Sequence, residues 1–142
     1  MKQLLRVQNF NVSSDGIGAG DQQSLESPFG LDTPVFVMTH HKRPSFTLSD
    51  TTFHFVDGDP ATILEQAREA AQGKDVRLGG GVTAIKQFLD ADLVDTMHVA
   101  VSPITLGSGL RLWESPDELR DRFHLEIVPS PSGVAHHLFW RK

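Results

Sequence analysis

Residues 75–94 read DVRLGGGVTAIKQFLDADLV, and this stretch is the strongest indication of the fold. Its first four residues predict a short strand, residues 79–81 a glycine turn, and residues 82–94 a helix with its apolar side chains on one face. A strand that runs through a glycine turn into a helix is half of a nucleotide-binding unit, because the backbone N–H groups at the helix start favour a phosphate. The motif is neither GxGxxG nor a P-loop, so a tight turn that needs only a positive φ angle is an equally good interpretation.

The rest of the chain predicts further strands and one more helix. Residues 35–38 (VFVM) form a continuous apolar run, which is typical of a central strand buried on both faces of a parallel sheet. Asp59 and Pro60 predict the N-cap and first residue of a helix that ends with Gly73 as its C-cap. Alternating runs rich in β-branched and aromatic residues predict strands at residues 4–12, 52–56, 95–103, 123–128 and 134–141. We therefore expect one α/β domain over residues 1–142, with a mixed, mostly parallel sheet, flanking helices and a C-terminal antiparallel hairpin.

Charge and residue content exclude several classes of function. The 142 residues include 13 Lys and Arg against 18 Asp and Glu, and the net charge of −5 offers no field that would attract nucleic acid or an anionic membrane. The chain has no cysteine, which excludes disulfides, thiolate metal sites and a cysteine nucleophile. No apolar run is long enough for a membrane helix, and the N-terminus lacks a signal-peptide pattern, so we expect a cytoplasmic protein.

Seven histidines raise the question of a metal site. The pairs at 40–41 and 136–137 are adjacent residues in extended segments, where successive side chains point to opposite faces of a strand. Neither pair can easily chelate one ion, and the chain has no HExxH or HxH spacing. We expect no bound metal, and histidines that are solvated or packed.

Residues 39–43, Thr-His-His-Lys-Arg, form a polar cluster directly after the apolar run at 35–38. In open α/β sheets, ligands bind beyond the carboxyl ends of the strands. Lys and Arg can neutralise a phosphomonoester while Thr and His donate hydrogen bonds, so the cluster suits the 2′-phosphate that distinguishes NADP from NAD. The alternative is a solvated polar loop.

Asp15 follows the first predicted strand in the sequence Ser13-Ser14-Asp15-Gly16. A carboxyl group at a strand end can hydrogen-bond the N–H groups of a substrate or relay a proton. The alternative is an ordinary Asp-Gly turn. Residues 106–110 predict a second turn, at which the chain passes close to a ligand or to a partner subunit. Its Gly-Ser-Gly does not fit the GxSxG motif of a nucleophilic serine.

Four stretches taken together resemble one known family. They are DTPVFVMTHH at residues 32–41, TTFHFV at 51–56, KDVRLGGG at 74–81 and PITLGSG at 103–109. In these motifs the chain resembles the dihydrofolate reductase-like family, and within it the bacterial proteins similar to the C-terminal reductase domain of the riboflavin-biosynthesis deaminase/reductase. The resemblance implies a homodimeric oxidoreductase that uses NADPH to transfer a hydride to a nitrogen heterocycle. The implied substrate is an aminopyrimidine such as 5-amino-6-(5-phosphoribosylamino)uracil, or a pterin.

The resemblance also assigns roles to individual residues. Asp15 takes the catalytic position, while Asn11 and Ile17 face the substrate. Gly79 and Gly80 correspond to a pair that the family joins by a cis peptide bond. The implied cofactor-binding residues are Thr39, His40, His41, Arg43, Leu78, Gly79, Gly80, Gly81, Val82 and Thr83.

The chain departs from the family between Gly30 and Asp32. Relatives carry a helix and a strand-to-helix turn at this point, which supply an arginine to the cofactor diphosphate and a wall to the substrate site. Either the chain is an internally deleted form of the fold, or a segment of the native protein is absent from the sequence. We favour the second interpretation, because a deletion exposes the apolar faces of the strands at 35–38 and 53–56.

A second hypothesis for the function is a non-catalytic binding module of the same fold. Such a module forms a dimer through the sheet edge and a surface that contains Trp113 and Trp140. It is not expected to oxidise NADPH in the presence of pterins or aminopyrimidines.

Overall fold

The computed structural model of the chain describes residues 3–19, 34–41, 43–48 and 51–142. Within these residues, no helix is both long and apolar enough to cross a membrane. The elements, in chain order, are β1 (Leu5–Val12), β2 (Ile17–Ala19), β3 (Val35–Met38), β4 (Phe46–Leu48), β5 (Thr51–Val56), α1 (Pro60–Ala71), β6 (Val76–Leu78), α2 (Val82–Asp90), β7 (Thr96–Val101), β8 (Leu110–Arg111), the 3-10 helix η1 (Pro116–Leu119), β9 (Phe123–Pro129) and β10 (Ala135–Arg141).

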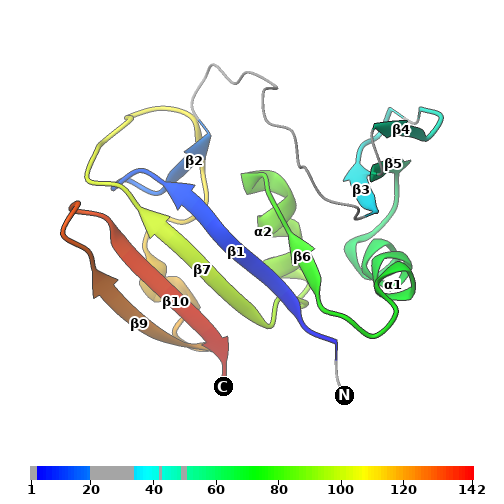
Figure 1. Ribbon diagram of the computed structural model, residues 1–142. Helices are drawn as coiled ribbons and strands as arrows, with labels where there is room; N and C mark the ends of the chain where they lie inside the picture. Colours follow the sequence, from blue (N-terminus) through cyan, green and yellow to red (C-terminus); the bar gives the residue numbers. More distant parts are fainter. Residues whose placement is uncertain (1–2, 20–33, 42, 49–50) are drawn as a thin grey trace.

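The largest sheet has five strands in the order β6-β1-β7-β10-β9 (Figure 1). Strands β6, β1 and β7 are parallel to one another, whereas β10 is antiparallel to β7 and to β9. The predicted C-terminal hairpin is therefore confirmed as β9 and β10. The sheet is mixed, as the sequence predicts, and its parallel part lies on the β6 side.

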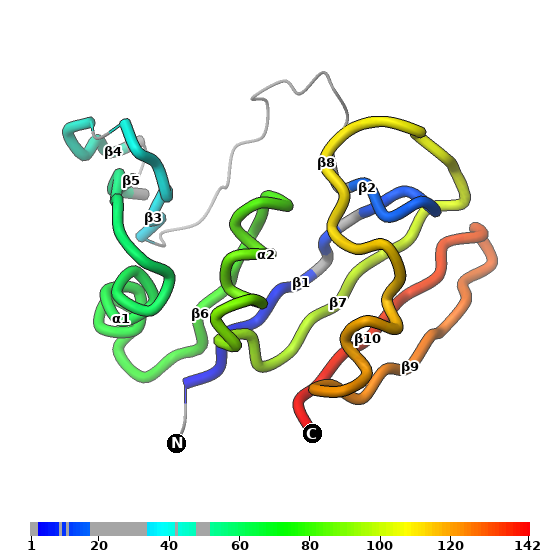
Figure 2. The backbone as a smooth tube through the Cα atoms, turned by 180° about the vertical axis from the view of Figure 1, so that it is seen from behind, coloured from blue at the N-terminus to red at the C-terminus, as the bar shows by residue number. Residues whose placement is uncertain are grey.

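One face of this sheet carries the core. Figure 2 shows α2 and the segment between β8 and β9 in front of the sheet. Ile85 on α2 is fully buried, and Phe139 on β10 packs edge-on against Phe123 with ring centroids 6.3 Å apart. No helix of the described residues covers β1, β7 and β10 on the opposite face, which is the face seen in Figure 1.

Trp113 and Trp140 do not share a surface, contrary to the second hypothesis. Trp113 is 7% exposed and lies in the core, with its ring 5.7 Å from the ring of Phe139. Trp140 is 42% exposed and stacks on His124 across the β9–β10 hairpin. Successive side chains of a strand point to opposite faces, so Phe139 enters the core and Trp140 leaves it.

Strands β3, β5 and β4 form a separate three-stranded sheet in the order β3-β5-β4. The prediction that Val35–Met38 is a central strand buried on both faces is therefore wrong. This strand pairs with β5 alone among the described residues, and all four of its residues are only half-buried. An apolar run without alternation shows that both faces are covered to some degree, but not how many neighbours the strand has. The expected gap between Gly30 and Asp32 lies outside the described residues.

Both predicted helices are present, and their ends differ from the prediction by a few residues. Asp59 caps α1, and its side chain accepts a hydrogen bond from the N–H of Thr62 at 2.8 Å. Gln72, in the left-handed conformation, is the C-cap in place of Gly73. Helix α2 ends at Asp90 instead of continuing to residue 94, and Asp92 just beyond it has a positive φ of 57°.

The adjacent histidines at 136 and 137 point to opposite faces of β10, as predicted. The Nδ1 atom of His136 lies 2.9 Å from Nε2 of His98, whereas His137 is buried with its ring 6.0 Å from that of Trp113. Burial and the neighbouring His136 both lower the pKa of His98, which favours its neutral form. In the part of the chain that the structure describes, no three His, Asp or Glu residues gather where they could hold a metal ion.

Replacing Phe139 by Ala should reveal how much the core depends on β10. Phe139 is 2% exposed, so its truncation leaves a cavity and should lower the free energy of unfolding by about 3–5 kcal/mol. Its neighbour Trp140 provides the matched control, because W140A on the open face should cost only about 1 kcal/mol. Urea unfolding followed by circular dichroism measures both values, and equal losses would contradict this assignment of faces.

Candidate functional site

Three connecting segments emerge at one edge of the five-stranded sheet. Residues 13–16 follow β1, residues 79–81 follow β6, and residues 102–109 follow β7. These three strands are parallel and adjacent in the order β6-β1-β7, so their carboxyl ends point to the same edge; β1 and β7 end together, and β6 ends opposite Val7 (Figure 1). This edge is where open α/β sheets bind ligands, and it contains two of the three groups expected from the sequence.

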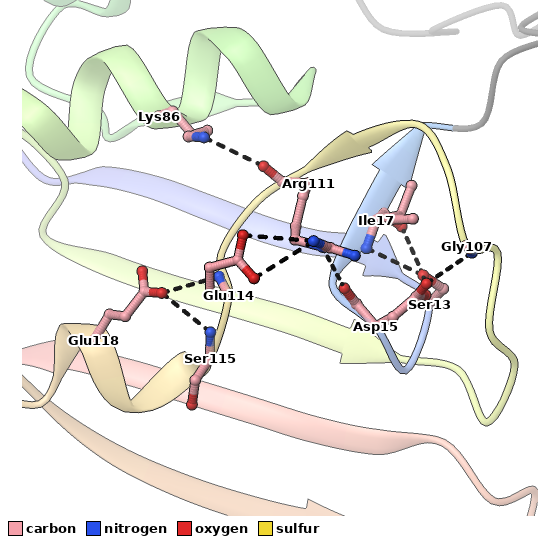
Figure 3. Close-up of polar contacts among 9 residues, drawn as sticks. All are labelled: Ser13, Asp15, Ile17, Lys86, Gly107, Arg111, Glu114, Ser115 and Glu118. Atoms are coloured by element: carbon pink, nitrogen blue, oxygen red, sulfur yellow. Dashed lines mark hydrogen bonds and ion pairs between the residues drawn. The ribbon is translucent and has the colours of Figure 1, made fainter.

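The carboxylate of Asp15 is held by the groups around it (Figure 3). The hydroxyl of Ser13 donates to Oδ1 at 2.5 Å. The backbone N–H of Leu106 donates to Oδ1 at 3.1 Å, and that of Gly107 donates to Oδ2 at 2.8 Å. Both carboxylate oxygens therefore accept hydrogen bonds from groups of the protein itself.

These hydrogen bonds stabilise the ionised form of Asp15. The hydroxyl of Ser13 contributes most and the N–H of Gly107 next, and together with weaker effects they lower the pKa of Asp15 from 3.8 to about 2. A general acid works best with a pKa near the working pH, so at neutral pH Asp15 is suited to accept hydrogen bonds and not to supply a proton. Of the two roles expected for Asp15, orienting and protonating, the electrostatics favour the first.

Arg111, on β8, supports the turn that carries Asp15. Its Nε donates to the main-chain oxygen of Asp15 at 3.0 Å, and its guanidinium forms an exposed ion pair with Glu114 at 3.4 Å. On the other side, Nζ of Lys86 on α2 donates to the main-chain oxygen of Arg111 at 3.4 Å. Figure 3 shows this chain of contacts running from α2 through β8 to the turn.

Gly16 lets the same turn approach the core closely. It has a φ of +81°, and a Cβ atom at this position would lie 2.8 Å from the main-chain oxygen of Trp113. The main-chain oxygen of Gly16 accepts a hydrogen bond from the N–H of Leu112 at 2.8 Å. The Asp-Gly pair is therefore a turn, as the alternative interpretation proposed, and also a contact with the core.

The glycine turn between β6 and α2 leaves its surroundings open. Added Cβ atoms at Gly79 and Gly81 would meet nothing within 4 Å, whereas one at Gly80 would meet the ring of Phe10 at 3.4 Å. The cis peptide bond lies between Gly80 and Gly81, so the expected position between Gly79 and Gly80 is wrong by one residue. Gly81 is the N-cap of α2, and the cis bond therefore directly precedes the helix.

The start of α2 has no side-chain cap. Gly81 provides no side-chain cap, and the first turn of the helix contains no acidic residue. The first N–H groups of any helix have no partner within it, and the helix dipole makes this end electropositive. Among the other expected contacts here, Thr83 is exposed, whereas Val82 is buried and can offer only its backbone.

The polar cluster after β3 is partly occupied by its own contacts. The hydroxyl of Thr39 accepts a hydrogen bond from the N–H of His41 at 3.0 Å. The Nδ1 atom of His40 lies 3.1 Å from the carboxylate of Asp57, although the His40 side chain is 91% exposed. The remaining basic residue between His41 and Arg43 lies outside the described residues.

Arg43 lies over an aromatic ring and is an exposed cation of this cluster. Its guanidinium carbon is 5.5 Å from the ring centroid of Phe55. The residues after β3 and the glycine turn follow strands of different sheets. Within the described ranges, no hydrogen bond or ion pair connects them. The structure therefore groups Asp15 with the glycine turn and leaves Thr39, His40, His41 and Arg43 on a separate element.

Two expected substrate contacts have different outcomes. Asn11 lies on β1, and its side chain is outside the described part of the structure. Ile17 is 2% exposed, so in this structure its side chain is buried and not presented at the surface. Pairing of β2 with β8 places Ile17 opposite Arg111, and its side chain packs into the interior.

Sequence reasoning missed the groups that hold Asp15. The Ser-x-Asp-Gly pattern is typical of turns in which side chains bond to nearby backbone, and it could have identified Ser13. Nothing local could have identified Arg111 or the N–H groups of Leu106 and Gly107, because these residues are more than 90 positions away in the chain.

Comparisons with known proteins agree with this architecture. The model of the family described as RibD C-terminal domain matches residues 12–130. The uncharacterized protein YyaP of Bacillus subtilis is 30% identical over 82 residues, which are 54% of this chain and 42% of that protein, so the chain spans less than half of this relative.

Two solved structures extend the similarity over nearly the whole chain. A putative riboflavin biosynthesis protein from Shewanella sp. PV-4 superposes with a TM-score of 0.64 at 18% identity, covering 100% of this chain and 99% of that one. Dihydrofolate reductase from Enterococcus faecalis, complexed with NADP(H), superposes with a TM-score of 0.58 at 12% identity, covering 99% and 96%. The α/β fold and the dihydrofolate reductase-like resemblance expected from the sequence are thereby confirmed.

Replacing Asp15 by Asn should remove a pH-dependent part of the stability. Because folding lowers the pKa of Asp15 from 3.8 to about 2, its contribution is complete above pH 3.8 and is lost as the pH falls through about 2. The difference in unfolding free energy between the wild type and D15N should therefore shrink as the pH is lowered across this interval. Urea unfolding at a series of pH values measures it, and a difference that is constant with pH contradicts the prediction.

Proposed function

Because this chain belongs to the RibD C-terminal domain family, we propose that it is a reductase that uses NADPH to reduce a substrate that contains a nitrogen heterocycle. The observation that carries the proposal is the start of α2. An uncapped helix end follows a glycine turn in which two of the three Cβ positions are open. A dinucleotide diphosphate needs this combination of free N–H groups and close backbone approach.

In this proposal, two groups of residues hold the cofactor. The backbone of Gly79, Gly81 and Thr83 binds the diphosphate, with Leu78, Gly80 and Val82 shaping the turn. Arg43, with Thr39, His40 and His41, binds the 2′-phosphate, for which an exposed guanidinium is suited. The bound cofactor supplies the hydride, and the protein contributes placement and electrostatics.

The substrate class is an aminopyrimidine or a pterin. The similarity to a putative riboflavin biosynthesis protein supports the first, and the similarity to dihydrofolate reductase supports the second. Both are flat heterocycles with several N–H groups, which apolar walls with a few polar groups recognise. The exposed side chains of Ile104, Leu106 and Leu110 provide apolar surface on the segment that follows β7.

NADPH should stabilise the wild-type protein and fail to stabilise a variant with a blocked glycine turn. At a hundredfold excess over the dissociation constant, a ligand adds about 2.7 kcal/mol, which raises the midpoint of thermal unfolding by roughly 5–10 °C. Gly79→Val fills open space at a residue with an ordinary φ, so the fold should be retained while the increase is lost. Differential scanning fluorimetry with millimolar NADPH measures both.

A control variant separates blocked binding from general damage. Ala70→Val adds bulk on the exposed side of α1 and should keep the full increase with NADPH. If NADPH raises the unfolding midpoint of Gly79→Val as much as that of the wild type, the glycine turn does not bind the diphosphate. No increase in the wild type would contradict cofactor binding altogether.

Arg43→Ala should weaken binding of NADPH but not of NADH. Only NADPH carries the 2′-phosphate, and loss of one charge-assisted contact costs about 1.5–3 kcal/mol, or roughly tenfold to a hundredfold in affinity. Titration of each cofactor against the fluorescence of the protein gives both dissociation constants. Equal weakening for the two cofactors would show that Arg43 stabilises the fold and does not bind the 2′-phosphate.

A further inference from the structure

We propose that Asp15 is a positioning residue, which fixes the segment 102–109 at the carboxyl edge of the sheet and acts on the reaction through that segment. The inference rests on the proposed function and refines the role of one residue in it. Asp15 lies between the glycine turn and this segment, because β1 lies between β6 and β7. The carboxylate of Asp15 accepts its backbone hydrogen bonds from the segment after β7.

The segment is held at four successive residues by the turn after β1. Ser14 donates its N–H at 2.6 Å and its hydroxyl at 2.5 Å to the main-chain oxygen of Ile104, and its hydroxyl lies 3.1 Å from that of Thr105. Asp15 then accepts from the N–H groups of Leu106 and Gly107. Two adjacent side chains of the turn thus fix residues 104–107.

The turn can act as an anchor because it is itself fixed to the core. The N–H and hydroxyl of Ser13 both bond to Ile17, a buried residue. Gly16 packs closely against Trp113, and Nε of Arg111 donates a hydrogen bond to the main-chain oxygen of Asp15. The turn is therefore attached to β2, β8 and the core, and residues 104–107 are attached to the turn.

The fixed segment presents apolar side chains to solvent. Ile104 is 54% exposed and Leu106 is 46% exposed, although large apolar side chains are usually buried. Holding them in place in advance lowers the entropy cost of binding a flat ring against them. The carboxylate of Asp15 suits this task because each of its two oxygens accepts one N–H group. An asparagine has only one acceptor oxygen for the two N–H groups.

Hydrogen exchange tests this role without relying on activity. In D15N, the amides of Leu106 and Gly107 should exchange about tenfold faster or more, because charge-assisted hydrogen bonds protect them in the wild type. The amides of β7 and β10 should keep their protection, which shows that the variant is folded. Unchanged exchange at residues 106 and 107 overturns the proposal, whatever the activity.

Asp59→Asn is the matched control. Asp59 also accepts backbone and side-chain hydrogen bonds, which lower its pKa, but it caps α1 in another part of the molecule. Its replacement should loosen the start of α1 and leave the exchange of residues 106 and 107 unchanged. If D59N accelerates exchange at these residues as D15N does, the effect is global and the proposal is overturned.

Kinetics distinguish positioning from proton transfer. With NADPH and 5-amino-6-(5-phosphoribosylamino)uracil as the probe, D15N should raise KM about tenfold, leave kcat within about threefold, and keep the pH profile of kcat. Loss of a proton donor would instead lower kcat by about 10²–10⁴ and change that profile, which would overturn the proposal. Failure of the proposed function itself appears separately, as absence of NADPH binding to the wild type while the exchange result stands.

Discussion

The pairing of β1 with β6 on one side and β7 on the other is the constraint on which the rest of this structure depends. Strand β6 pairs with the first part of β1, from Leu5 to Val7, whereas β7 pairs with β1 as far as its last residue, Val12. The side chains of Leu5, Val7 and Val12 are buried, which fixes the register, because a slip of one residue would turn them to the opposite face. With the strands parallel and the register set, all three point toward the same edge of the sheet, and β1 and β7 end side by side.

Sequence periodicity predicts the elements that depend on nearby residues. Helix α1 has a local cap in Asp59, and the β9–β10 hairpin has its breakers in the segment between its strands, so both are found near the expected places. The sequence does not predict the short strands β2, β4 and β8 or the helix η1. The η1 helix has a capping box between Ser115 and Glu118, but its four residues contain too few apolar side chains for a periodic signal.

The candidate site shows the same difference between features set by nearby residues and features set by distant ones. The glycine turn is visible in the sequence because its chemistry is contained in three consecutive residues. The role of Asp15 is not visible, since it is decided by N–H groups that lie far away in the chain and meet it only after β1 and β7 have paired. The burial of Ile17 likewise follows from the pairing of β2 with β8, a contact between strands too short to recognise beforehand.

The division into two main sheets has a consequence for how copies of this chain meet one another. Strands β6 and β3 are each paired on one side only among the described residues, so each leaves a row of backbone N–H and C=O groups unpaired. Native edges are usually protected by charge, and Arg77 with the neighbouring Arg6–Asp75 ion pair provides it on β6. Strand β3 reads Val-Phe-Val-Met and has no such charge. Strand β3 is therefore less protected than β6 against self-association by edge-to-edge strand pairing, which high concentration and warming favour.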